Sequence, residues 1–194
     1  MLRRISSVLA LAGVAFLSGF SRADAYLPEP LAQLTHDARK LAAGLAAPTA
    51  LEVFDLSTGY HVGLNSSASM PAASTIKIPV MVEVFSQLQA GKFDLQKRVR
   101  LNASDKDWGS GDLCEAPVGT TYSISVLLDK MIDISDNTAT NMLIRLVGRR
   151  TINRDMSYLG LRHTHLGEDI RTDDWAIRKG LRTSPSDLVH LLSL

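Results

Sequence analysis

The chain has 194 residues, of which 45% are hydrophobic and 21% are charged. This is the composition of a globular protein with a sizeable core, and it excludes a disordered chain, a collagen-like chain and a disulfide scaffold. The formal net charge of +1 leaves no basic surplus for phosphate contacts, so nucleic acid is not expected as a partner. The single cysteine, Cys114, excludes an internal disulfide and a cysteine metal cluster.

Residues 1–25 have the pattern of a secretory signal peptide. Two arginines are followed by an apolar run over residues 5–20, and residues 23–25 supply the small side chains that a signal peptidase needs. The run of about 16 residues is short for the roughly 20 that cross a bilayer, although an uncleaved membrane anchor is the alternative. Cleavage before Tyr26 removes three arginines and one aspartate, which leaves the domain 26–194 with a formal charge of −1. We expect a periplasmic or secreted protein without a further membrane segment.

The start of the mature chain predicts a helix followed by a β-hairpin. Leucine and alanine residues at helical spacing indicate an amphipathic helix over about residues 31–47. Residues 51–56 alternate between apolar and polar side chains, a Ser-Thr-Gly turn follows, and residues 60–64 complete the hairpin. Residues 65–73 are small and polar, which indicates a loop.

A second helix is expected over about residues 74–90, with a glycine directly after it as the C-terminal cap. Pro79 costs about 3 kcal/mol deep inside a helix but little in a first turn. We therefore expect either a bend at Pro79 or a regular helix that begins later than Ser74. Residues 99–101 are expected to be extended, and a long loop with three glycines follows over residues 102–121.

The second half of the chain predicts mainly helices. Ser123 and Asp136 are expected to be the N-caps of two of them, because their side-chain oxygens can accept hydrogen bonds from the first N–H groups. A third, short helix is expected over about residues 151–159. Residues 162–183 are irregular and charged, and Ser184 followed by a proline starts the last helix.

Ser74-Thr75-Ile76-Lys77 is the first candidate for chemistry. Positions three apart share one face of a helix, with about 5–6 Å between their Cβ atoms. A serine hydroxyl needs a base within hydrogen-bond reach, and a lysine can be that base if burial or a neighbouring cation lowers its pKa. The backbone N–H of Ser74 at the start of the helix could stabilise an oxyanion. The alternative is an N-cap serine followed by a solvated lysine.

Ser135-Asp136-Asn137 is the second candidate, at the junction of two predicted helices. A hydroxyl there could relay a proton to a leaving group. The Asn137 amide can both donate and accept, so it suits both a lysine and a substrate amide. The alternative is a simple capping turn, because these residue types are favoured caps.

Together the two motifs resemble the penicilloyl-serine transferases, and most closely the class A β-lactamases, for which both motifs are signatures. The resemblance covers about residues 31–194. It implies an α/β (α+β) fold of the β-lactamase and DD-peptidase type, with a helical lobe and an antiparallel sheet flanked by helices. It also implies a monomeric serine hydrolase that acts on a β-lactam or a peptidoglycan-like peptide without cofactor or metal.

The resemblance also implies roles for the motif residues. Ser74 would be the acylated nucleophile and Lys77 its proton partner. Ser135 would protonate the leaving nitrogen, and Asn137 would hold Lys77 and the acyl-amide group of the substrate. Water would then hydrolyse the acyl-enzyme.

One departure from the family is that its third motif, Lys-Thr-Gly, lies on a strand beyond the last residue here. That strand also supplies a second N–H to the oxyanion, and losing one such donor costs roughly 10²–10³ in rate. The hairpin supplies only two convincing strands, and an isolated hairpin is marginal in water. We therefore expect the C-terminal strands of the sheet to be missing, and a fragment that is inactive by itself.

A second departure concerns the Glu-x-x-x-Asn motif that activates the deacylating water in class A enzymes. Counting back from Pro185 places Glu168 at the position of that glutamate, whereas counting forward from Ser135 places Ile170 there. Glu168 is the first choice and Asp169 the second, with a solvated charged loop as the alternative. If no carboxylate reaches Ser74, the acyl-enzyme is long-lived and the activity is penicillin-binding or peptidase-like. A non-catalytic exported domain of the same fold is the remaining hypothesis.

The long loop contains two further residues of interest. Trp108 could form one wall of the site, since an aromatic face packs against a flat substrate, but a hydrophobe that anchors the loop is the preferred interpretation. Cys114 is expected to be a free thiol in the same loop. His163 and His165 show no ligand spacing with nearby acids and are expected at the surface.

Overall fold

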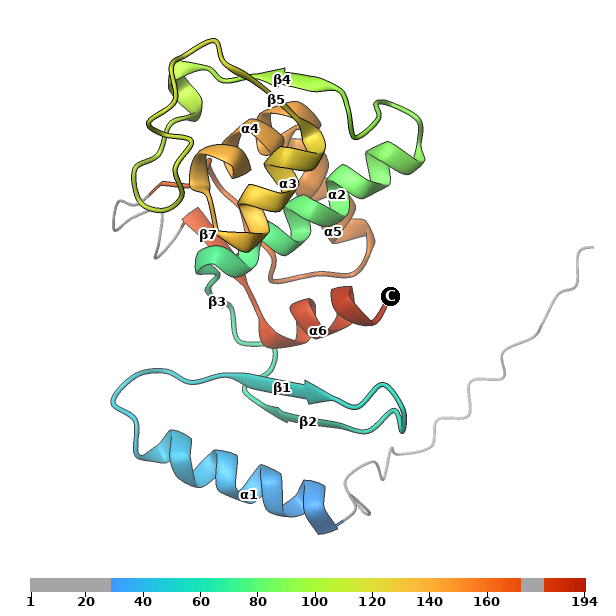
Figure 1. Ribbon diagram of the computed structural model, residues 1–194. Coiled ribbons are helices and arrows are strands. Elements are labelled where there is room, and N and C mark those ends of the chain that lie inside the picture. Colours follow the sequence, from blue (N-terminus) through green and yellow to red (C-terminus); the bar gives the residue numbers. More distant parts are fainter. Residues whose placement is uncertain (1–28, 172–179) are drawn as a thin grey trace, which may run out of the picture.

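The computed structural model describes residues 29–171 and 180–194, so the expected signal peptide lies outside the described residues. Figure 1 shows two parts, one above the other: a helical body and, below it, a β-hairpin with a helix on either side. Within the described ranges, no helix is long and apolar enough to cross a bilayer.

The lower part is a two-stranded antiparallel sheet between two helices. In the sheet, Leu51 lies opposite Leu64, as the predicted hairpin requires. One helix contacts the second strand and the other contacts the first strand from the opposite side (Figure 1). The elements are α1 (Glu29–Ala43), β1 (Leu51–Phe54), β2 (His61–Leu64) and α6 (Pro185–Ser193).

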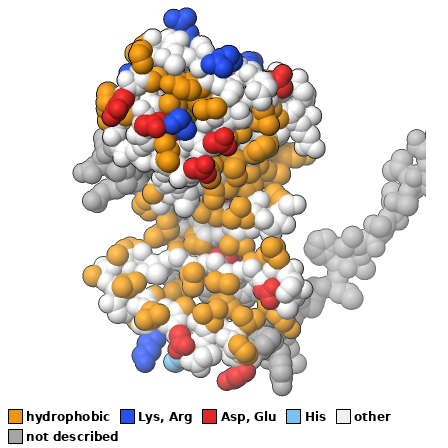
Figure 2. Space-filling view, viewed as in Figure 1, with side chains coloured by type: hydrophobic (Ala, Val, Ile, Leu, Met, Phe, Trp, Pro, Cys, Tyr) orange, Lys and Arg blue, Asp and Glu red, His pale blue; other side chains and the backbone are white. Residues whose placement is uncertain are grey.

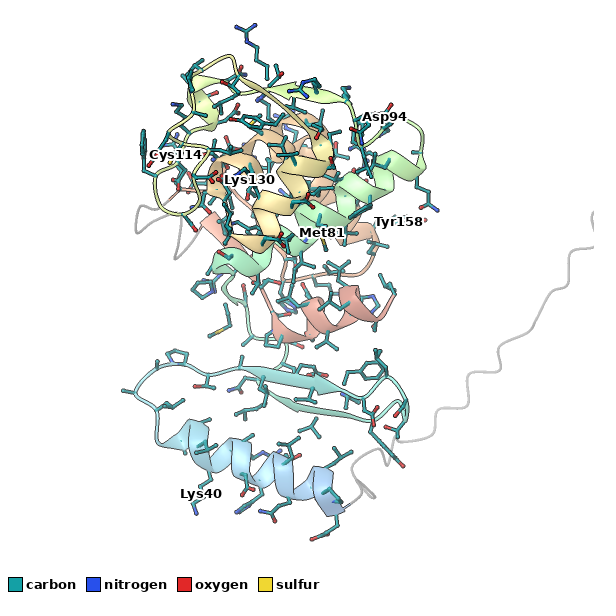
Figure 3. The ribbon with its side chains drawn as sticks, in the orientation of Figure 1. Lys40, Met81, Asp94, Cys114, Lys130 and Tyr158 are labelled. Atoms are coloured by element: carbon teal, nitrogen blue, oxygen red, sulfur yellow. The ribbon has the colours of Figure 1, made fainter. Side chains whose placement is uncertain are left out.

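The first helix ends earlier than the spacing of its leucines indicated. It stops at Ala43 because Gly44 follows, and the Gly44 N–H closes a tight turn on the Leu41 carbonyl at 3.1 Å. None of the α1 residues is buried, and Lys40 points away from the hairpin (Figure 3). This helix therefore covers the sheet without forming a closed core.

The helical body has its own apolar core. Val80, Leu127, Met142 and Ile152 come from four different helices and are 0% exposed. Side chains at helical spacing converge there, as expected for amphipathic helices. The helices are η1 (Ala73–Ile76), α2 (Lys77–Gln89), η2 (Ala103–Asp105), α3 (Ile124–Asp133), α4 (Asn137–Val147) and α5 (Arg149–Tyr158).

The helix starts confirm the predicted caps. The Ser123 hydroxyl accepts from the N–H of Val126 at 3.4 Å, and the Asp136 carboxylate accepts from the N–H of Ala139 at 2.7 Å. Ser184 caps α6 in the same way, with proline in the first turn. Each of these oxygens accepts from an N–H group that has no partner inside its helix.

The helix predicted to start near Ser74 is divided. Residues 73–76 form the 3₁₀ turn η1, and the regular helix α2 begins only at Lys77. Pro79 therefore lies in the first turn of α2, where a missing N–H costs little. Of the two expectations, the later start of the helix is correct.

The chain forms more strands than the two that the sequence clearly indicated, and the strand over Arg98–Arg100 confirms the extended segment expected over residues 99–101. Three further antiparallel pairs are formed by segments of two or three residues, which are too short to show an alternating pattern. They lie in and beside the loops expected over residues 65–73, 102–121 and 162–183, and tertiary contacts bring them together. The strands are β3 (Met70–Pro71), β4 (Arg98–Arg100), β5 (Thr121–Ser123), β6 (His165–Leu166) and β7 (Leu181–Thr183).

Candidate active site

The two sequence motifs begin two helices that face one pocket. Ser74 lies in η1 and Lys77 is the first residue of α2, while Ser135 precedes α4 and Asn137 begins it. Ala73 and Ser135 both adopt positive φ values, 44° and 56°, which side chains other than glycine rarely do. Such backbone strain gathers where the surrounding structure holds functional groups in place.

A chain of hydrogen bonds joins the two motifs. Lys77 Nζ donates to Ser135 Oγ at 2.7 Å and to Asn137 Oδ1 at 2.8 Å, and it also donates to the Ser135 carbonyl. Ser135 Oγ donates to Ser74 Oγ at 3.0 Å. Hydroxyls 61 positions apart in the sequence are therefore in contact, and the Ser135 hydroxyl lies between the exposed Ser74 hydroxyl and the buried amine.

Burial changes the acid–base behaviour of Lys77. The side chain is 2% exposed, and desolvation lowers the pKa of its amine from 10.5 to about 8, although the charges of Asp136 and Asp107 act in the opposite direction. An amine with this pKa is partly neutral near pH 7 and can accept a proton. Lys77 therefore has the lowered pKa that a lysine needs to act as the base for a serine nucleophile.

Asp136 joins the long loop to the start of α4. It is 0% exposed, and its second carboxylate oxygen accepts the N–H groups of Asp112 and Leu113 at 2.8 and 2.9 Å. Gly111 passes so close that a Cβ there would lie 2.2 Å from this carboxylate, so the loop needs glycine at this point. Asp136 thus holds the loop against the helix that carries Asn137.

Asp107 belongs to neither motif and was not predicted from the sequence as a site residue. Its Oδ1 accepts a hydrogen bond from Asn137 Nδ2 at 2.8 Å, and it is 8% exposed. Thirty positions separate the two residues, and an aspartate inside an irregular loop carries no periodic signal. Only the folded loop shows that it contacts the site.

The pocket at Ser74 is a cavity of about 230 Å³ with two different walls. One wall is polar and carries both motifs. The other is formed largely by the aliphatic side chains of Ile170 and Leu181 and by Ala73, the residue before the serine. The described lining residues are Ala73, Ser74, Lys77, Gly109, Ser110, Asn137, Ile170, Arg171 and Leu181.

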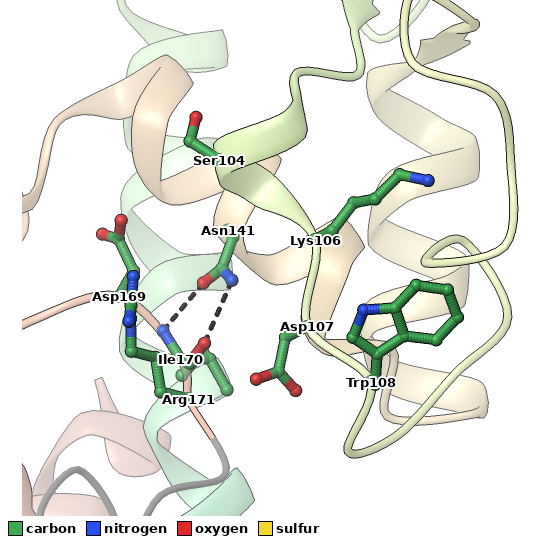
Figure 4. Close-up of a pocket in the computed structure, with 8 residues that line it drawn as sticks. All are labelled: Ser104, Lys106, Asp107, Trp108, Asn141, Asp169, Ile170 and Arg171. Atoms are coloured by element: carbon green, nitrogen blue, oxygen red, sulfur yellow. Dashed lines mark hydrogen bonds between the residues drawn. The ribbon is translucent and has the colours of Figure 1, made fainter.

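The acidic residues predicted for deacylation are not among the described residues that line this pocket. Ile170 lines it instead, because the Asn141 side chain accepts its N–H at 2.7 Å and donates to its carbonyl at 3.1 Å (Figure 4). Asp169 lines neighbouring cavities, and Glu168 lies against Gly180 with Oε1 buried and unpaired. Ile170, the residue reached by counting forward from Ser135, is thus the one of the two that is among the described lining residues.

Trp108 lies in the cavity next to the Ser74 pocket. It is 71% exposed, so the interpretation as a loop anchor is wrong, and its ring lies 5.8 Å from Lys106 Nζ. Figure 4 shows Trp108 with Asp107 and Arg171 around this second cavity of about 300 Å³. Ile170 and Arg171 line both cavities, so the indole borders the site without being among the described lining residues of the Ser74 pocket.

The remaining side chains singled out from the sequence lie away from the pocket. Cys114 is a buried free thiol in the long loop (Figure 3). His165 is exposed, and His163 is half-buried with its ring nitrogen 3.4 Å from Asp187. Across residues 29–171 and 180–194, no group of three His, Cys, Asp or Glu side chains has the arrangement of a metal site.

Known proteins are similar to this chain in sequence and in fold. The model of the β-lactamase enzyme family matches residues 33–194. A β-lactamase of Rhodobacter capsulatus is 26% identical over 148 residues, which make up 76% of this chain and 50% of that protein. The chain thus spans about half the length of this curated relative.

Two solved structures are similar at comparable identity. A β-lactamase of Sphaerobacter thermophilus is 33% identical with a TM-score of 0.70, over 79% of this chain and 58% of its own. PBP-A is 32% identical with a TM-score of 0.74, over 82% of this chain and 59% of its own. A variant of PBP-A with leucine replaced by glutamate forms an acyl-enzyme with penicillin G. These similarities confirm the expected fold, in which a helical lobe accompanies antiparallel strands flanked by helices.

Proposed function

The chain belongs to the β-lactamase enzyme family, and from that premise we propose that it is an acyl-serine enzyme whose nucleophile is Ser74. The observation that carries the proposal is the hydrogen-bond chain from Lys77 through Ser135 to Ser74. A serine becomes nucleophilic when a base lies within reach of its proton, directly or through one relay. The substrate class is a β-lactam or a peptidoglycan-like peptide, since both have an amide carbonyl that a serine can attack.

Acylation uses the polar wall. Neutral Lys77 accepts the Ser74 proton through the Ser135 hydroxyl, and Ser74 Oγ forms a bond to the amide carbon. The Ser135 hydroxyl then delivers a proton to the leaving nitrogen as the carbon–nitrogen bond breaks. Asn137 keeps its oxygen on Lys77 and offers an N–H to the acyl-amide oxygen of the substrate. The backbone N–H of Ser74 stabilises the oxyanion.

Deacylation distinguishes two functions. Fast hydrolysis of a β-lactam requires a carboxylate that activates water beside the acyl-enzyme, and Ile170 lines the pocket where that group is needed. We therefore favour a penicillin-binding or peptidase-like function with a long-lived β-lactam adduct. Sequence identity does not distinguish the two functions, because PBP-A and a β-lactamase are 32% and 33% identical to this chain, so the choice rests on Ile170. A fast β-lactamase remains the second candidate, with Glu168 as its base.

Labelling with fluorescent penicillin tests the proposal. We expect the full-length protein to form a covalent adduct that is retained after the free drug is removed, and Ser74→Ala in the same protein to abolish labelling. Rapid release with turnover of a chromogenic cephalosporin would favour the fast β-lactamase. If no acylating probe labels the parent, and Ser74→Ala behaves identically, only the hypothesis of a non-catalytic exported domain remains.

Export is part of the same proposal. We propose that residues 1–25 direct the protein out of the cytoplasm and are removed, so that residues 26–194 belong to the catalytic domain. A periplasmic or secreted location brings the pocket to peptidoglycan-like substrates, and the domain acts as a monomer. Mass spectrometry of the exported protein should show Tyr26 at its N-terminus, and a retained Met1 would contradict cleavage.

A further inference from the structure

The carboxylate of Asp107 contacts the site from the long loop that precedes α3. Both of its side-chain hydrogen bonds described here end on one oxygen, Oδ1, which accepts the N–H of Gly109 at 2.9 Å and Asn137 Nδ2 at 2.8 Å. Its backbone is held as well, because the Thr138 hydroxyl accepts the Asp107 N–H and donates to the Asp107 carbonyl. Asp107 is therefore attached to the first turn of α4 by both its main chain and its side chain.

This attachment determines which way the Asn137 amide faces. A carboxylate only accepts hydrogen bonds and an ammonium group only donates them, so Nδ2 must face Asp107 and Oδ1 must face Lys77. Without a carboxylate on one side, the amide could rotate by 180° and present N–H groups to the lysine. With it, the second N–H of Nδ2 remains available to the pocket that Asn137 lines.

The charge of Asp107 acts on the same lysine. Asp136 and Asp107 are the two charges that favour the protonated form of Lys77 against its burial. Asp136 also accepts three backbone N–H groups, which makes it a structural residue of the loop and helix. On its other side Asp107 borders the cavity with Lys106, Asp169 and Arg171, the charged residues that line it in the described chain (Figure 4).

We propose that Asp107 is a positioning residue for acylation: it locks the orientation of the Asn137 amide that binds Lys77, and through this contact its negative charge helps to keep Lys77 protonated. This inference rests on the acyl-serine function proposed above. The two roles can be separated, because one depends on an oxygen acceptor at this place and the other on a charge.

Two substitutions at Asp107 separate its effect on the Asn137 amide from the effect of its charge on Lys77. Asp107→Asn keeps the Oδ1 acceptor and removes the charge. The acid limb of the pH profile, where the penicillin-labelling rate rises as Lys77 loses its proton, should therefore move to lower pH by about one unit. Asp107→Glu keeps the charge but displaces the carboxylate by one methylene. We expect its acid limb to stay in place and its labelling rate to fall about 10-fold or more, because the Asn137 amide is no longer held.

Asp112→Asn is the matched control on the same loop. It removes one negative charge from an exposed ion pair with Lys130 and should change neither the acid limb nor the rate. If the acid limb of Asp107→Asn is the same as that of the parent, the role of the charge is refuted. If Asp107→Glu is labelled at the parental rate, the role in holding the Asn137 amide is refuted. Asp107→Glu also tests the amide role if Asp107→Asn does not fold.

A titration that needs no activity keeps this inference distinct from the proposed function. The NMR signal of the Lys77 ε-methylene group reports its protonation directly in the parent and in Asp107→Asn. If the parent is not labelled by penicillin, the acyl-serine function fails, whereas a downward shift of the Lys77 titration still supports the role of the charge. An unchanged titration overturns that role whatever the labelling shows.

Discussion

The two walls of the Ser74 pocket are built from different kinds of structure and suit different steps of one reaction. The polar wall comes from the starts of two capped helices, whose side chains hydrogen-bond to one another. The opposite wall presents Ile170 and, from the short strand β7, Leu181. The first wall has the groups that acylation requires, and the second has an aliphatic side chain where deacylation requires a base.

The two walls are held in place by different kinds of contact. Lys77, Asp136 and Asn137 are buried and have several partners each, so a change at any of them affects the others. The main chain of Ile170 is held by the Asn141 amide, and its side chain is 6% exposed and packs in the apolar core. Because the Asn141 hydrogen bonds involve only backbone atoms of residue 170, they can persist when its side chain is replaced.

The largest effect is expected at the polar wall, from Lys77→Met. Methionine has a similar length and fills the buried space, but it cannot accept a proton. The rate of penicillin labelling should fall by about 10²–10⁴. In the parent the labelling rate should rise as the pH rises through about 8, where Lys77 becomes neutral, and the variant should lose this dependence. Equal rates and pH profiles in both proteins would remove Lys77 from the mechanism.

A smaller effect is expected at the apolar wall, from Ile170→Glu. The hydrogen bonds of Asn141 to the backbone hold the new carboxylate at the pocket, where it can activate water. Release of bound penicillin should become about 10-fold faster or more, with little change in the labelling rate. The measurement is the loss of fluorescence from purified adduct over time.

Glu168→Gln is the control for this prediction. Glu168 is not among the described residues that line the pocket, so its neutral variant should release penicillin at the parental rate. A slower release in Glu168→Gln would show that this carboxylate reaches the acyl-enzyme. The two walls would then share the acid–base chemistry, and the fast β-lactamase would become the better proposal.

The smallest effect is expected from Glu83→Gln, at a buried residue of α2 that is not part of the described lining of the pocket. Glu83 is 1% exposed, and its Oε1 accepts a hydrogen bond from Gln87 at 2.7 Å. Burial, together with the nearby Asp155, raises the pKa of this carboxyl above its ordinary 4.5. The folded state therefore favours the protonated form, so the contribution of Glu83 to stability is fully present below pH 4.5 and is lost as the pH rises through the raised pKa.

Glutamine imitates the protonated acid and can donate to Asp155. At pH 7 the free energy of unfolding should increase by about 1 kcal/mol, and this gain should disappear as the pH is lowered towards 4.5. Urea unfolding at the two pH values measures it. Because Glu83 is not among the residues that line the pocket, the labelling rate should remain that of the parent, and a change in it would couple this part of α2 to the polar wall.

Local sequence was sufficient wherever a side chain acts on its own helix. Ser123, Asp136 and Ser184 begin helices because a side-chain oxygen and an N–H group two or three positions away meet without help from the rest of the chain. The position of Pro79 similarly limited where the regular helix could begin. The spacing of Ser74 and Lys77 was also local, and it placed both at the start of one helical segment.

The sequence by itself thus determined the helices, the hairpin and the family of the polar motifs. Only the tertiary structure decided that Asp107 contacts Asn137, that Ile170 rather than Glu168 lines the pocket, and that Trp108 is exposed beside it. The physical reason is that these positions lie in loops without a repeating pattern. Their surroundings depend on contacts with residues some thirty positions away, such as Asn141 with Ile170, and not on the dihedral preferences of their neighbours.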